Sequence, residues 1–196
     1  MGGHGDRVYV RGDIEEQQNY DIFRQGKIYR DPVTDEFLGI NANFIANAKV
    51  VEQFGRDVAE EEINPLELQR TTQEVRAADR LFSTEERVIR STFFPSEPPA
   101  DSEGLILDVP RGIAMVGKLD VVTINLGEQD GLKEGNVLAI YKTGETVRDR
   151  VSGDQLKIPD ERSGLLMVFR VYERVSYGLV LQASRQLAIM DKVKNP

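Results

Sequence analysis

The sequence predicts a mainly β protein made of two related small units, each a β-barrel or β-sandwich with short helical turns. Three observations predict this fold: an internal repeat, segments in which apolar and polar residues alternate, and turns marked by Gly or Asp. The 196 residues suffice for one large or two small domains. We expect a first unit over residues 5–82, a connector over 83–103 and a second unit over 104–196.

The repeat is clearest where RQGKIYRDPV (24–33) returns as KTGETVRDRV (142–151), with Ile22 aligned to Ile140, 118 residues later. Two further blocks follow the same order. TTQEVRAADRL (71–81) aligns with ASRQLAIMDKV (183–193), and DRVYVRG (6–12) resembles DVVTINLG (120–127). Three matches in one order are hard to obtain by chance, so we infer two copies of one unit.

Most of each unit is predicted to be strand. RVYV and VVTI alternate and are rich in β-branched residues, and YDIF (20–23) and VLAIY (137–141) follow as strands. The segment LLMVFRVYERVSYGLVLQAS (165–184) predicts a hairpin that turns near Val175-Ser176. In the first copy, FLGINANFI and AKVVEQF are expected to fill the place of this hairpin.

Short helical turns are expected after the last long strand of each copy, at QEVRA and RQLAI. Thr71 and Glu74 have the spacing of a capping box. A further short helix is expected over TEERVIRST (84–92), before the Pro-rich linker SEPPADSEG (96–104).

The repeated ten-residue stretch is predicted to encode shape. Gly26 and Gly144 suit turns with positive φ, and DPVTDEFLG and DRVSGDQLK suit hairpin loops in which Asp bonds its own downstream backbone. The alternative is a paired site of two Arg-Asp dipeptides. We favour turn geometry with a local salt link.

The composition argues against several partner classes. Acidic residues exceed basic ones by eight, so the chain repels phosphate, and nucleic acid is not an expected partner. No apolar run is long enough for a membrane span, and the start MGGHGDRV lacks the apolar core of a signal peptide.

Catalysis is hard to assign to this sequence. There is no cysteine, and His4 is the only histidine, so nucleophilic triads and thiolate metal sites are not expected. The run Glu60-Glu61-Glu62 lacks the alternating spacing of a calcium loop. Nothing selects a pair of carboxylates for glycoside cleavage. We therefore expect a non-enzymatic protein without metal or cofactor.

Segments present in only one copy are the expected partner-binding sites, because shape already explains a repeated segment. One is the glycine-marked loop GEQDGLKEGN (127–136), read as two turns around a short bulge. The second is the aromatic pair in the connector, which could instead pack as a staple, and the third is the acidic run. The expected residues are Glu128, Asp130, Lys133, Glu134, Phe93, Phe94, Glu60, Glu61 and Glu62.

The blocks that carry the repeat also resemble a known family. GDRVYVRG, YDIFRQGKIYRDPVTDEFLG, TEERVIRSTFFPSEPP and INLGEQDGLKEGNVLAIYKTGETVRDRV together resemble the region that follows the LysM module in proteobacterial LysM-domain proteins, a group associated with type IV pilus secretins. The block INLGEQDGLKEGNVLAIY is also similar to the C-terminal domain of the flagellar assembly protein FlgT.

The resemblance implies a periplasmic protein that associates with an outer-membrane secretin ring and helps to anchor it. In that family the LysM module binds peptidoglycan. No such module is recognisable in these residues, so peptidoglycan binding is assigned to none of them. The competing hypotheses are a stand-alone glycan-binding module, although the chain has no Trp platform, and an accessory domain of a wall hydrolase.

Overall fold

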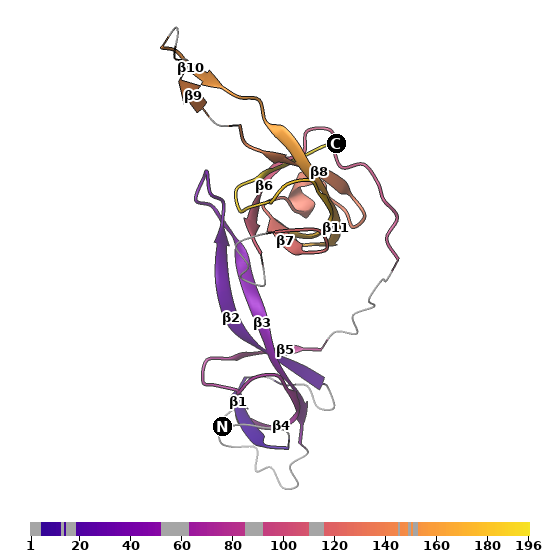
Figure 1. Cartoon of the computed structure of the whole chain (residues 1–196). Helices are drawn as coiled ribbons and strands as arrows, with labels where there is room; N and C mark the ends of the chain where they lie inside the picture. The colour runs from indigo at the N-terminus through magenta and orange to yellow at the C-terminus, as the bar shows by residue number, and fades with distance from the viewer. Residues whose placement is uncertain are drawn as a thin grey trace. The chain divides into compact units, whose positions relative to one another are not determined.

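A computed structural model describes residues 5–12, 14, 19–51, 63–84, 92–109, 116–144, 146–148, 150 and 153–196. Nearly all regular structure in these residues is β, as the sequence predicts (Figure 1). The one helix among them is a single 3₁₀ turn, η1 (Glu128–Asp130). Contacts divide the chain into two compact units. Residues 1–28 and 40–89 form the first, and residues 29–39 and 90–196 form the second.

The first unit is built on a five-stranded antiparallel sheet in the order β1-β4-β3-β2-β5. Its interior holds Tyr20, Ile22, Ile45, Leu66 and Leu68, with two buried alanines. The strands are β1 (Arg7–Arg11), β2 (Asn19–Arg30), β3 (Phe37–Val50), β4 (Ile63–Thr71) and β5 (Arg80–Ser83).

The second unit is a closed six-stranded barrel in the order β11-β12-β7-β6-β13-β8. Ile106, Ile124, Leu138, Leu166 and Val180 are fully buried within it. The barrel strands are β6 (Glu103–Asp108), β7 (Val121–Ile124), β8 (Val137–Lys142), β11 (Glu161–Val171), β12 (Ser176–Ala183) and β13 (Lys192–Lys194). Between β8 and β11, β9 (Thr146–Arg148) and β10 (Gln155–Lys157) pair as a separate two-stranded hairpin.

The two units repeat one strand order. The first sheet, β1-β4-β3-β2-β5, corresponds strand for strand to β7-β12-β11-β8-β13 of the barrel. The register is repeated as well: Ile22 faces Leu81 in the first unit, and Ile140 faces Val193 in the second. The barrel has one strand more, β6, which pairs with β13 and β7 and closes it.

The predicted hairpin at 165–184 is present as β11 and β12, which turn at residues 172–175. Its inward residues are Leu166, Val168 and Val180. In the first copy the expectation was wrong. FLGINANFI and the start of AKVVEQF form one continuous strand, β3, and the second arm is β4, which contains Pro65 and was not predicted as a strand.

Two local expectations are also wrong. QEVRA and RQLAI are not helical: each is an irregular turn, in which Asp79 accepts the Arg76 N–H and Asp191 accepts the Ala188 N–H. Positive φ angles occur at Ala78 and Met190, but not at Gly26 or Gly144.

The two repeated glycines are instead places of close backbone approach. A Cβ on Gly144 would lie 1.8 Å from the Ile158 carbonyl oxygen, and one on Gly26 would lie 3.0 Å from that of Asn41. A side chain therefore does not fit at either position without movement of the facing segment.

Candidate protein-interaction sites

The loop GEQDGLKEGN is a firmly held turn on the second unit. Asp130 accepts the Gly127 N–H at 2.7 Å, and the N–H groups of Glu128 and Gln129 donate to the carbonyls of Tyr172 and Glu173. Leu132 is buried beneath it. The two predicted turns are therefore present, and the charged residues named from the sequence, Glu128, Asp130, Lys133 and Glu134, are all exposed.

The connector lies along this same loop. Ser96 forms a parallel bridge with Asn136, and the Asn136 amide donates to Ser96 Oγ and to the Glu97 carbonyl, both at 2.9 Å. A Cβ on Gly135 would lie 2.4 Å from the Phe94 carbonyl oxygen. The structure thus brings two of the three predicted segments together, which their sequence separation did not indicate.

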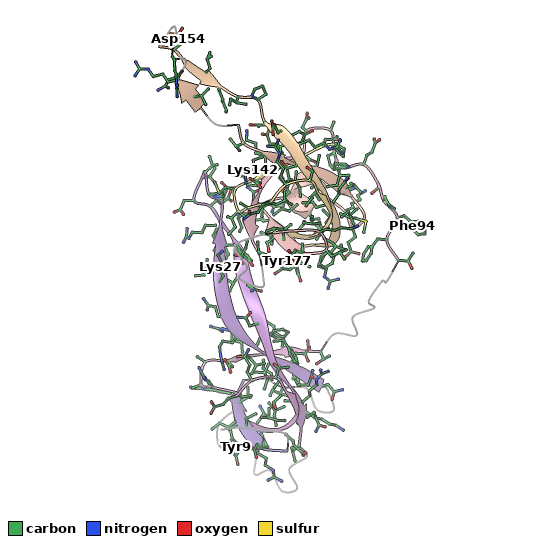
Figure 2. All side chains as sticks on the ribbon, viewed as in Figure 1. Tyr9, Lys27, Phe94, Lys142, Asp154 and Tyr177 are labelled. Carbon is green, nitrogen blue, oxygen red and sulfur yellow. The ribbon has the colours of Figure 1, made fainter. Side chains whose placement is uncertain are left out.

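Of the aromatic pair, Phe94 does not pack as a staple. Phe94 is 81% exposed, and Figure 2 shows its side chain pointing outward from the connector. Phe93 is half-buried. The third predicted segment, Glu60–Glu62, and residues 85–91 of the expected helix lie outside the described residues.

The described part of the chain contains no group of three or more His, Cys, Asp or Glu side chains that could hold a metal ion. None of the described helices is long and apolar enough to cross a membrane. The carboxyl groups with shifted pKa values are engaged in the fold. The hydrogen bond from Lys192 and the Gly144 N–H lower the pKa of Asp160, and those from Arg24 and the Arg76 N–H lower that of Asp79.

The local salt link expected in the repeated stretch joins Arg30 to Asp35 at 3.6 Å, and a second link of this stretch is long-range. Arg24 donates twice to the Asp79 carboxylate, each at 2.8 Å, and Lys142 lies 3.5 Å from Asp191 at the equivalent place. In the first Arg-Asp dipeptide, Asp31 accepts the N–H groups of Val33 and Thr34 within its own turn. Asp149 of the second dipeptide lies outside the described residues.

The two copies differ in the burial of their hairpin tips. In the first copy the tip, Tyr29–Gly39, belongs to the second unit, where Tyr29 and Leu38 pack with Leu107 and Val175. Tyr29 is 3% exposed.

Polar contacts fix this tip on the barrel. The Tyr29 hydroxyl donates to Asp108 at 3.1 Å, and the Asn125 amide donates to Asp31 at 2.7 Å. Arg174 donates to the Glu36 carboxylate at 2.5 Å. Burial raises the pKa of Tyr29 above its ordinary range. The hairpin tip of one copy is therefore a protein-binding element within this molecule.

The tip of the second copy is the β9–β10 hairpin, with Asp154 near its far end (Figure 2). The turn is the same. Arg148 donates to the Gly153 carbonyl, as Arg30 donates to that of Asp35. By the 118-residue offset, Val147 stands where Tyr29 stands, and Leu156 where Leu38 stands. Here the apolar pair is exposed, Val147 by 39% and Leu156 by 52%.

Comparison with known proteins adds no family. The sequence matches no protein-family model and no curated protein at a significant level. The candidate sites therefore stand on geometry alone.

Sequence reasoning predicted a hairpin loop at DRVSGDQLK but assigned it no binding role, because it attributed repeated segments to shape. A signal was present: apolar residues recur in the repeat at the positions of Tyr29 and Leu38, as Val147 and Leu156. The sequence does not indicate that the hairpin tip of the first copy packs against the barrel while the apolar pair of the second tip is exposed.

Proposed function

We propose that this protein is a non-enzymatic interaction module of the cell envelope that binds a partner protein through its β9–β10 hairpin. The observation that carries the proposal is the contrast between two equivalent tips. Tyr29 and Leu38 are packed against a barrel, whereas Val147 and Leu156 are exposed on the same hairpin framework.

The physical chemistry favours a protein surface as the ligand of this hairpin. Burying one Val or Leu side chain is worth about 1.5–3 kcal/mol, so two neighbouring ones can anchor a contact. Leu156 pairs with Val147 across the hairpin, which places both side chains on one face. Basic and acidic side chains border this pair, at Arg148, Lys157 and Asp154, and would provide a polar rim around the apolar anchor.

The partner that the sequence resemblance suggests is the outer-membrane secretin of type IV pili, and the location it suggests is the periplasm. In this proposal the two β units dock on the ring, and a peptidoglycan-binding LysM module would provide the wall contact. Both elements of the proposal rest on the resemblance. The exposed hairpin supports only the more general statement that the chain has a surface suited to a protein partner.

The test is a pull-down from detergent-solubilised envelope with the protein immobilised. The bait would be the wild type, the double variant Val147→Asp/Leu156→Asp, or the control Val33→Asp. Val33 is an apolar residue 79% exposed on the equivalent turn of the first copy, so the control makes the same chemical change. We expect the wild type and the control to recover the secretin, and the double variant to lose it.

Equal recovery by all three baits would contradict a role for the hairpin. Recovery of no envelope protein by the wild type would contradict the docking function itself. Pelleting of the purified protein with sacculi would favour the competing glycan-binding function.

A further inference from the structure

The first unit contains every strand of the barrel except one. Its sheet order ends at β1 and β5, and the equivalents of these strands in the second unit, β7 and β13, are joined by β6. Among the described residues, no strand pairs with the outer edges of β1 and β5. We call the place between these two edges the strand slot.

Burial differs between the units at the positions that border the slot. Val122 and Ile124 of β7 and Val193 of β13 are fully buried against β6 in the second unit. Their equivalents are only half-buried: Val8, Val10 and Leu81.

At two central positions away from the slot the two units are alike. Ile22 and Ile140 are 3% and 0% exposed, and Leu68 and Val180 are both fully buried. The positions beside the missing strand are therefore more exposed than their barrel equivalents, as is Val50 at the end of β3, whose equivalent Val168 is fully buried.

The backbone of β1 is oriented to accept a strand. In an antiparallel pair, opposed residues alternate between those that exchange hydrogen bonds and those that do not. Tyr9 faces Pro65, which has no N–H, so this pair is of the second kind and the Tyr9 N–H and C=O point away from β4. Arg7 and Arg11, two residues away on either side, share that direction. In the barrel, the equivalent of Arg11 is Asn125, whose N–H donates to the Leu105 carbonyl of β6 at 3.2 Å.

The β5 side of the slot also has an equivalent in the barrel, where the turn before β13 bonds to β6. Ile106 of β6 donates its N–H to the Asp191 carbonyl and accepts the N–H of Met190. The equivalents in the first unit are Asp79 and Ala78, and Ala78 keeps the unusual positive φ of Met190, 76° against 74°. A strand that entered the slot would therefore meet the same bonding pattern.

Charge indicates the composition of the incoming strand. Arg7 and Arg11 on β1 and Arg80 on β5 are exposed at the two edges. The strand that fills the barrel, Glu103–Asp108, is acidic at both ends, and Glu103 pairs with Lys194 of β13 at 3.0 Å. Exposed arginines favour a strand of the same acidic character.

We propose that the strand slot of the first unit binds an extended segment of a partner protein as its sixth strand. The segment is about six residues long, runs antiparallel to both β1 and β5, places apolar side chains toward Val8, Val10 and Leu81, and carries acidic residues at its ends. This is strand addition at a sheet edge, in which backbone hydrogen bonds provide affinity and alternate side chains provide specificity. The slot is a second site, independent of the β9–β10 hairpin.

The test uses a fluorescent peptide with the sequence of residues 101–110, DSEGLILDVP, which copies β6, added to the whole protein. Binding is followed by fluorescence anisotropy and located by hydrogen exchange. We expect saturable binding that slows exchange in β1 and β5. A peptide with Asp in place of its Ile106 residue should bind at least about tenfold more weakly, because that side chain enters the core.

The decisive protein variant is Tyr9→Pro, which removes one N–H that points into the slot and leaves the β1–β4 hydrogen bonds in place. We expect at least tenfold weaker peptide binding with an unchanged circular dichroism spectrum and melting temperature. Tyr9→Ala, which keeps the N–H, should bind within about twofold of the wild type. A second variant, Arg7→Glu/Arg80→Glu, changes only exposed side chains and should weaken binding most at low salt.

Three results would overturn the proposal. The peptide could fail to bind, it could bind Tyr9→Pro as tightly as the wild type, or hydrogen exchange could find the outward amides of β1 already protected in the free protein. The last result would mean that the polypeptide fills its own slot.

Discussion

Arg24 holds Asp79 by two hydrogen bonds of 2.8 Å, although 55 residues separate them in the chain. Lys142 and Asp191 repeat the pair in the second unit at 3.5 Å. Arg24 also donates to the Glu74 carbonyl, and Lys142 to that of Gln186. In both copies one basic side chain therefore links a strand, β2 or β8, to the irregular turn that precedes β5 or β13.

Asp79→Asn should destabilise the first unit at neutral pH by about 1–3 kcal/mol, since it weakens a charge-assisted, partly buried hydrogen-bond network. The hydrogen bond from Arg24 lowers the pKa of Asp79 below its ordinary 3.8. A depressed pKa contributes stability above the ordinary value and loses it as the pH falls through the folded value.

The difference between wild type and Asp79→Asn should therefore shrink at pH below about 3.8. Urea unfolding of both proteins at pH 7 and at acidic pH measures it. A difference that stays constant across this range would mean that the charge of Asp79 is not what stabilises the turn.

Val8→Ala should cost less stability than Val122→Ala, although the two valines are equivalent in the repeat. Val122 is fully buried behind β6 and its truncation should cost about 2 kcal/mol, whereas half-buried Val8 should cost about half as much. Denaturant unfolding of the two variants, with each unit followed by hydrogen exchange, provides the comparison. Equal costs would argue that the first core is as closed as the second.

Tyr29→Phe removes the hydroxyl that bonds Asp108 and should cost about 1 kcal/mol, while Tyr29→Ala empties the apolar cluster and should cost about 3–5 kcal/mol. Burial raises the pKa of Tyr29, so its contribution is complete below the ordinary value of 10.0 and declines as the pH rises above it. Burial also raises the pKa of Tyr177, so ultraviolet titration at 295 nm should show late ionisation of both tyrosines in the wild type and of one fewer in Tyr29→Phe. Ionisation of all tyrosines together near the ordinary value would contradict the packing of this tip.

Gly135→Ala and Gly153→Asp should differ sharply in effect, although both glycines have positive φ, 97° and 80°. A Cβ at residue 135 would lie 2.4 Å from the Phe94 carbonyl oxygen, whereas the nearest atom to one at residue 153 is 3.9 Å away. The equivalent of Gly153 in the first copy is already an aspartate, Asp35, with φ 59°.

Gly153→Asp should therefore change the melting temperature by a few degrees at most. Gly135→Ala should cost roughly 2 kcal/mol or more, because the connector must move. Thermal unfolding of the two variants gives the answer. A harmless Gly135→Ala would show that the connector does not pack on the loop.

The sequence was most informative where the repeat constrained it. The alignment of Ile22 with Ile140 and of Leu81 with Val193 predicts equivalent strand pairing, and the structure has it. The alternation at 165–184 predicts the β11–β12 hairpin correctly because one face of that hairpin is fully buried.

The failures have physical causes as well. Pro65 and the adjacent acidic residues argued against a strand at β4. A proline is accommodated there because Tyr9 and Pro65 face each other as a pair that exchanges no hydrogen bonds, so the missing N–H is not required. Gly26 and Gly144 indicated turns, but their conformation is ordinary and the constraint is a neighbouring strand. Barrel closure depends on the long-range pairing of β6, and the exposure of a hairpin tip depends on what packs against it. The periodicity of apolar residues along the sequence indicates neither of these.

The measurement that tests the central claim most directly is site-specific photo-crosslinking in living cells, with the photoreactive residue placed at Leu156 or, as a control, at Val33. Both positions are exposed, by 52% and 79%, on equivalent hairpins. If the β9–β10 hairpin is the docking element, position 156 should crosslink one envelope protein, the secretin, and position 33 should not. Crosslinks that are absent at 156, or the same at both positions, would contradict it.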